Sequence, residues 1–80
     1  MLNKGGRIMK ARVKWFNNEK GFGFLEYKEG CDIFVHYSQI VKEGYKTLEA
    51  GTLVNFELIS TDKGYQAHKV QEESTTLINV

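Results

Sequence analysis

Residues 22–37, which read FGFLEYKEGCDIFVHY, decide how this 80-residue chain folds. Two runs rich in aromatic and β-branched residues, 22–28 and 32–37, stand on either side of a turn at Glu29-Gly30. Such runs, separated by a few turn residues, are typical of two antiparallel neighbouring strands. The stretch therefore predicts a β-hairpin.

The two faces of this predicted hairpin differ in chemistry, because side chains alternate between the faces of a strand. One face is aliphatic and is the natural core, whereas the other presents aromatic rings to solvent. The alternative is that the phenylalanines form the core, as they usually do in strands, but a complete aliphatic face makes this the weaker interpretation. The aliphatic set is Leu25, Ile33 and Val35, and the outward set is Phe22, Phe24, Phe34 and His36.

Outward from the hairpin, three further runs predict strands at residues 11–17, 53–59 and 65–71, with Val54 and Phe56 as core candidates. A short helical turn is expected near Ser38–Val41. Five short strands with mostly short turns favour a small closed barrel, which leaves no open edge. The predicted organisation is a basic flexible N-terminal tail (1–10), one barrel domain (11–71) and a C-terminal tail (72–80).

Exposed phenylalanines form an apolar patch, and such patches usually mark a binding site. Seven of the ten aromatic residues fall between Trp15 and Tyr37, and Arg12, Lys14 and Lys20 stand beside them. Rings on which bases stack, next to cations that attract phosphates, are the features of single-stranded nucleic-acid binding. Trp15 is expected to be largely exposed as a stacking surface.

Charge is unevenly distributed along the chain, although the net charge is only +1. Residues 1–20 hold six basic side chains and one acidic one, and residues 21–80 hold five basic and nine acidic ones. This asymmetry predicts a positive strip on an otherwise acidic body, which would attract phosphates locally.

Enzyme and metal chemistry find little support in the sequence. No phosphate-binding loop, nucleophile–base arrangement or pair of carboxylates in an apolar setting occurs. His36, His68 and Cys31 do not have the spacing of a zinc site, so no cofactor is expected. A single cysteine and the lack of a secretory or membrane-spanning segment predict a cytoplasmic protein without a membrane partner.

Several motifs occur together at a characteristic spacing: KWFN (14–17), EKGFGF (19–24), DIFVHYS (32–38) and EGYKTLEAG (43–51), followed by Gly64 and Gln66-Ala67. Over residues 11–71 the chain resembles the bacterial cold-shock protein family. The resemblance implies a five-stranded antiparallel OB-fold barrel that binds single-stranded RNA and DNA and acts as an RNA chaperone and regulator of transcription or translation. It implies the contact residues Lys14, Trp15, Phe16, Asn17, Lys20, Phe22, Phe24, Asp32, Phe34, His36, Tyr37, Tyr45 and Lys63.

The chain departs from the family pattern at the last turn, where Tyr65 stands in place of a common proline. This change either adds a stacking surface or relaxes the loop. A protein–protein adaptor that holds a peptide in the aromatic groove is the main alternative function, and a small nuclease is a weaker one. Monomer and strand-exchanged homodimer both remain open for a fold of this size.

Overall fold

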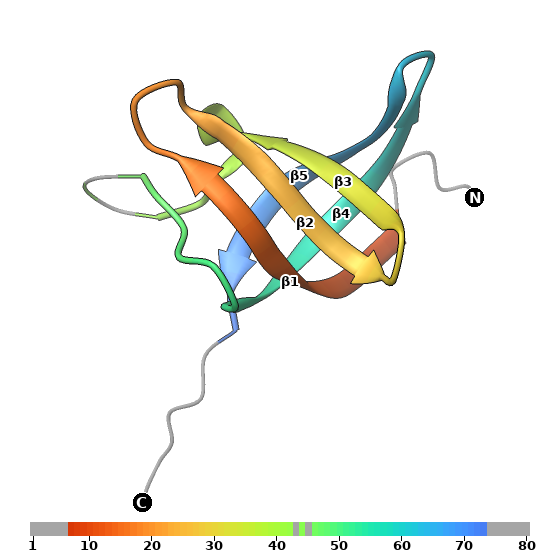
Figure 1. Cartoon of the computed structure of the whole chain (residues 1–80), viewed down its shortest axis with the longest axis horizontal. Coiled ribbons are helices and arrows are strands. Elements are labelled where there is room, and N and C mark those ends of the chain that lie inside the picture. Colours follow the sequence, from red (N-terminus) through yellow and green to blue (C-terminus); the bar gives the residue numbers. More distant parts are fainter. Residues whose placement is uncertain (1–6, 43, 45, 74–80) are drawn as a thin grey trace, which may run out of the picture.

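The computed structural model describes residues 7–42, 44 and 46–73. These residues form a closed barrel in which the strands follow the order β1-β2-β3-β5-β4 around the ring (Figure 1). The predicted all-β, five-stranded barrel is therefore confirmed. Its elements are β1 (Arg7–Asn17), β2 (Phe22–Lys28), β3 (Cys31–His36), the 3-10 helix η1 (Tyr37–Gln39), β4 (Leu53–Thr61) and β5 (Gly64–Glu72).

Four of the five strand pairs are antiparallel, and β3 and β5 are parallel, pairing Phe34 with Gln66 and Val35 with Ala67. The barrel is therefore antiparallel except at this one pair. Strand direction must alternate around an antiparallel ring, and five strands cannot alternate all the way round. At least one parallel pair is therefore a geometric necessity of closing an odd number of strands.

β1 is longer than the sequence predicted because it has two partners. Its first half pairs with β4 over Arg7–Arg12, and its second half pairs with β2 over Arg12–Asn17. Assigning residues 7–10 to a loose tail is therefore wrong, since their backbone completes the barrel through β4. At the other end β5 continues to Glu72. The remaining parts of the two predicted tails, 1–6 and 74–80, lie outside the described residues.

The core lies inside the barrel and draws residues from all five strands. The aliphatic set of the central hairpin, Leu25, Ile33 and Val35, is at most 1% exposed, as its alternation predicted. Burying an aliphatic side chain of this size contributes roughly 1.5–3 kcal/mol. The predicted core positions in β4 are confirmed as well. The full core is Ala11, Val13, Leu25, Ile33, Val35, Ile40, Leu48, Val54, Phe56, Ala67 and Val70.

An irregularity in β5 keeps that strand packed against the core. The register between β4 and β5 shifts between Asn55 and Glu57, and on β5 Lys69 has a φ of 53°. Side chains two apart normally share a face, yet Ala67 and Val70 are three apart and both are buried. The extra residue of a β-bulge accounts for this spacing.

Candidate nucleic-acid interface

A β-bulge at Lys14 decides where Trp15 points. The register between β1 and β2 shifts by one residue between Val13 and Trp15. In a regular strand Trp15 would share the inward face of Val13, which is 2% exposed. The extra residue reverses the alternation, so Trp15 lies outside the barrel, 41% exposed and paired with Phe24. Phe16 consequently turns inward and packs, half-buried, against the core.

Gly23 allows β1 and β2 to approach closely at this bulge. A Cβ atom on Gly23 would lie 2.2 Å from the carbonyl oxygen of Trp15 and 2.7 Å from the Cα atom of Phe16. Non-bonded heavy atoms prefer separations of about 3.5–4.0 Å. Any larger residue at position 23 would therefore push the β1 backbone away and move the Trp15 ring.

The outward rings contact one another across three strands. The ring centroid of Trp15 lies 5.9 Å from that of Phe22 and 5.4 Å from that of Phe24. Phe34 contacts the same two phenylalanines, at 5.7 and 5.8 Å. These separations are within the range of favourable aromatic pairs. We call Trp15, Phe22, Phe24 and Phe34 the aromatic platform.

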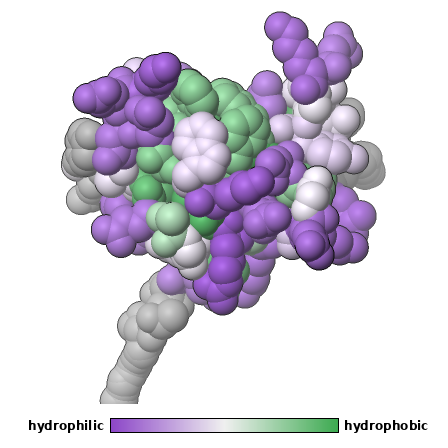
Figure 2. All heavy atoms as spheres, in the orientation of Figure 1, coloured by the Kyte–Doolittle hydropathy of each residue, from purple (hydrophilic) through white to green (hydrophobic). Residues whose placement is uncertain are grey.

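The aromatic platform remains accessible to a ligand. Its phenylalanines are half-buried, so part of each ring faces solvent. In Figure 2 apolar side chains gather near the top of the view, between hydrophilic side chains at the β1–β2 turn and at the β4–β5 hairpin. The predicted outward position of these rings is confirmed.

His36 extends the platform at the end of β3. Its ring lies 4.6 Å from that of Tyr37, with an angle of 31° between the planes. The backbone N–H of Ser38 donates a hydrogen bond to Nδ1 of His36 at 3.2 Å. A neutral imidazole that accepts at Nδ1 carries its proton on Nε2. His36 therefore presents an N–H donor on a ring beside the platform.

Tyr37 borders a pocket at the same end of the molecule. Its ring is 49% exposed and covers Gly21, whose Cβ, if it had one, would lie 2.6 Å from Cδ2 of the tyrosine. Asn18 and Lys46 also line this pocket. A ring and a cation therefore lie together next to His36.

A second pocket lies between the platform and the β4–β5 hairpin. Phe24 and Phe34 contribute to it from the platform, and Lys63 and Tyr65 contribute from the hairpin. The structure thus places Lys63 in one pocket with two platform rings that lie far from it in the sequence. One pocket thus combines Lys63 with two platform rings, and the other combines Lys46 with the ring of Tyr37.

Comparison with known proteins identifies the family. A family model described as the 'Cold-shock' DNA-binding domain matches residues 9–73, which include every strand of the barrel except the first two residues of β1. The chain belongs to the cold-shock domain family. Proteins of this family bind nucleic acids and are not enzymes.

Individual relatives agree with this assignment. The chain is 57% identical to the cold shock-like protein CspLB of Listeria monocytogenes and 51% identical to the cold shock protein CspB of Bacillus caldolyticus. Each match covers 63 residues, 79% of this chain and 96% of the relative. A solved structure titled drosophila Unr CSD456 superimposes with a TM-score of 0.71 at 17% identity, covering 92% of this chain and 30% of that one. That likeness concerns the fold alone.

Folding pairs two lysines of the predicted positive strip of this cold-shock domain with acidic residues. Nζ of Lys10 lies 3.2 Å from Oε2 of Glu73, and Nζ of Lys14 lies 3.0 Å from Oδ2 of Asp32. The hydrogen bond to Asp32 raises the pKa of Lys14 above its ordinary value. Both acids come from residues 21–80, which are acidic overall. Folding therefore brings basic side chains of the first 20 residues next to acidic side chains of the later part of the chain.

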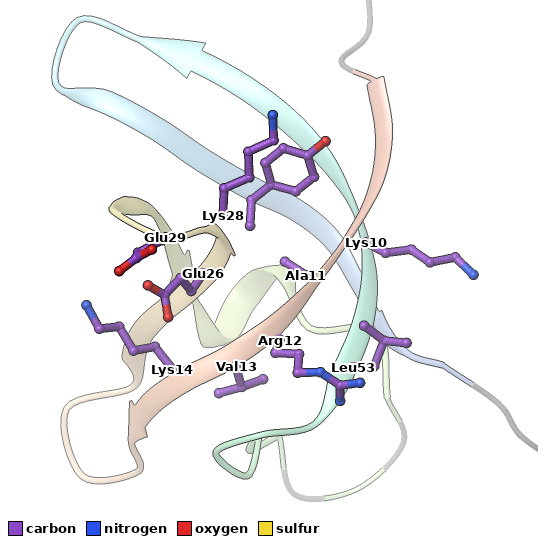
Figure 3. A pocket seen from close by; sticks show the side chains of 10 residues that line it. Lys10, Ala11, Arg12, Val13, Lys14, Glu26, Lys28, Glu29 and Leu53 are labelled. Atoms are coloured by element: carbon purple, nitrogen blue, oxygen red, sulfur yellow. The ribbon is translucent and has the colours of Figure 1, made fainter.

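The outer surface of β1 and β2 accordingly has mixed charge. Figure 3 shows Arg12, Lys14 and Lys28 in one pocket with Glu26 and Glu29. Nη1 of Arg12 also donates a hydrogen bond to the carbonyl oxygen of Gly51 at 2.9 Å. This open pocket combines both signs of charge, so we do not assign it to phosphate binding. Among the described residues, the lysines that form no ion pair include Lys20, Lys46 and Lys63, all in loops that border the platform.

Three residues of the predicted contact set, Phe16, Asn17 and Asp32, have other places than the platform, and a fourth is not described. Phe16 packs inward, so the structure does not bring it to the outer face. Asn17 shapes the β1–β2 turn, where its Oδ1 accepts a hydrogen bond from the backbone N–H of Lys20 at 2.8 Å. Asp32 holds Lys14 at the margin, and Tyr45 lies outside the described residues.

Within 7–42, 44 and 46–73, no three His, Cys, Asp or Glu side chains converge as metal ligands would. The part of the chain that the structure describes contains no helix with the length and apolar character needed to cross a bilayer.

Proposed function

We propose that this cold-shock domain binds single-stranded RNA and DNA with low sequence selectivity by stacking bases on the aromatic platform. The observation that carries the proposal is the contact of four outward rings across β1, β2 and β3, with centroids 5.4–5.9 Å apart. Every base has a π face, so stacking tolerates any sequence. Lys20, Lys46 and Lys63 stand where they meet the phosphates of a strand that crosses the platform.

Preference for single strands follows from the same geometry. Bases in a duplex are stacked on one another, and a protein ring reaches a base face only after the base leaves that stack. Each base stacked on an aromatic side chain contributes roughly 1–3 kcal/mol. A platform that holds two or three bases therefore favours the unpaired strand by several kcal/mol.

The biological consequence is that bound RNA is held open. A base on Phe22 or Phe34 is unavailable for pairing, so binding shifts RNA toward unpaired states without ATP. This supports a role as an RNA chaperone in the cytoplasm that influences translation or transcription termination. The closed barrel needs no second chain to complete the platform, which favours a monomer over a strand-exchanged homodimer.

The proposal is tested by removing one platform ring while keeping its apolar bulk. Phe34→Leu is expected to weaken binding of a fluorescent single-stranded oligonucleotide by roughly fivefold to a hundredfold, the loss of one stacked base. Tyr27→Leu is the control, because Tyr27 is an exposed aromatic ring (40%) on β2 that lies off the platform. Fluorescence anisotropy measures both affinities, and thermal unfolding confirms that both variants fold.

A second assay follows the chaperone activity directly. An RNA hairpin labelled with a fluorophore and a quencher should open as wild-type protein is added, with no ATP present. Equal affinities for wild type, Phe34→Leu and Tyr27→Leu would show that the platform is not where bases bind. A hairpin that stays closed at saturating protein would contradict the chaperone role.

A further inference from the structure

The β4–β5 hairpin projects from the barrel (Figure 1) and shares a pocket with the aromatic platform. Between the two lies the pocket formed by Phe24 and Phe34 on one side and by Lys63 and Tyr65 on the other. Two platform rings therefore contribute to a concave surface whose other wall belongs to a different hairpin. A ligand lying on the platform reaches this pocket without leaving the surface of the protein.

The strand register shows how the pocket continues the platform. One transverse row runs from Trp15 on β1 to Phe24 on β2 and Phe34 on β3, each paired with the next. Across the parallel pair, the next residue in this row is Gln66 on β5. The row of rings therefore ends at the carboxamide of Gln66, and Gln66 lines the same pocket as Phe24, Phe34 and Tyr65.

Tyr65 has little role in holding the barrel together. Its side chain is 47% exposed, and it stands one residue after the turn of the hairpin, paired with Ser60. It is not part of the hydrophobic core. Because Tyr65 lines the same pocket as Phe24 and Phe34, its exposed side chain adds an aromatic surface where two platform rings are already open to solvent.

Lys63 supplies the charge that a nucleotide would need here. It lies at the tip of the hairpin, exposed, and forms no ion pair with any described residue. The turn is held by Thr61, whose Oγ1 accepts from the backbone N–H of Lys63 at 3.1 Å and donates to the carbonyl oxygen of Gly64 at 2.7 Å. The backbone of Lys63 is thus fixed while its ammonium group remains available for a phosphate.

We propose that this pocket is an additional nucleotide site, in which Tyr65 stacks one base beyond those on the platform and Lys63 contacts its phosphate. The inference rests on the proposed function, because the extra base belongs to the same single strand. It assigns to Tyr65 a binding role rather than a relaxation of the turn. It also predicts that this chain binds a strand one nucleotide longer than the platform alone would hold.

The test uses single-stranded oligonucleotides that lengthen by one nucleotide at a time. For wild type, affinity should rise with each nucleotide until the pocket is filled. Tyr65→Ser should reach its plateau one nucleotide earlier and bind the longer strands about tenfold more weakly, equivalent to ~1.4 kcal/mol. Tyr65→Phe keeps the ring and should follow wild type, which separates loss of stacking from loss of the hydroxyl group.

Abasic oligonucleotides give an independent readout. Removing the base from the terminal nucleotide, at one end or the other of the strand, should weaken binding to wild type by the same factor and leave Tyr65→Ser unaffected. Free mononucleotide should not compete with the oligonucleotide for binding at concentrations where the oligonucleotide saturates the protein, because a mononucleotide lacks the platform contacts.

The outcomes separate the inference from the function on which it rests. If Tyr65→Ser binds every length as tightly as wild type, and wild type does bind single strands, the additional site is overturned and the platform function stands. If wild type binds no single strand of any length, the proposed function fails and the inference fails with it.

Discussion

Replacement of Gly23 by alanine is expected to damage both the barrel and the aromatic platform. The added methyl group would lie 2.2 Å from the carbonyl oxygen of Trp15, 2.7 Å from Cα of Phe16 and 2.8 Å from Cδ1 of Phe16. Two of these three atoms belong to the backbone, so rotation of a side chain cannot relieve the crowding. The strand itself must move by about 1 Å or more to restore ordinary contacts.

The free energy of that movement sets the expected loss of stability. Overpacking of a tight interior costs typically 1–3 kcal/mol, and we expect Gly23→Ala to lie near 3 kcal/mol because backbone is displaced. In a domain of this size that loss lowers Tm by roughly 12–24 °C. Urea unfolding measures the free energy, and the emission spectrum of Trp15, the single tryptophan, reports the displaced bulge.

Gly30→Ala is the matched control for this prediction. Gly30 has a φ of 84°, but no atom lies within 4 Å of the position that its Cβ would take. Its substitution therefore costs only the left-handed backbone strain of roughly 1–2 kcal/mol and should leave Trp15 emission unchanged. A Gly23→Ala variant no less stable than Gly30→Ala, with wild-type emission, would refute the account of the bulge.

Three further predictions concern stability and charge. Lys69 has a positive φ that glycine adopts more readily, so Lys69→Gly should raise the free energy of unfolding, measured with urea, by about 0.5 kcal/mol. Lys69→Val should lower it by more than ~1 kcal/mol. The hydrogen bond from Lys10 lowers the pKa of Glu73 from its ordinary value of 4.5. The stability that results is present above pH 4.5 and is lost as the pH falls through the folded-state pKa. Glu73→Gln should therefore flatten the acid dependence of the free energy of unfolding, measured by unfolding titrations at several pH values. Lys20→Gln should reduce the salt dependence of single-strand binding, measured as the slope of log K against log salt, by roughly 0.7. Lys14→Gln should reduce this slope by less, because Asp32 already forms an ion pair with Lys14. A peptide-binding adaptor would show neither change.

The central hairpin could be predicted from sequence because its alternation is regular. Leu25, Ile33 and Val35 all lie on the buried face of β2 and β3, and the platform rings of these strands all lie on the other face. No register shift interrupts the pairing of the two strands over these residues. A two-residue period is sufficient to assign faces wherever the strand is regular. The fold class followed from the number and spacing of such strands.

The sequence could not show what depends on irregular or distant contacts. The bulge at Lys14 reverses the faces of Trp15 and Phe16, and strand periodicity contains no signal for an inserted residue. The ion pair between Lys14 and Asp32 joins β1 to β3 across β2, so the charge blocks along the chain gave a misleading picture of the surface. The position of Gln66 beside Phe34 required the parallel pair that closes the barrel.

The most direct test of the central claim is a titration of the wild-type protein with a pyrimidine-rich oligonucleotide, followed by the fluorescence of Trp15. Because Trp15 is part of the aromatic platform, a base stacked there should quench its emission. We predict saturable quenching at micromolar protein, a midpoint that rises with added salt, and much weaker quenching by the same oligonucleotide annealed to its complement. Absence of quenching by the single strand, or equal affinity for the duplex, would contradict the account.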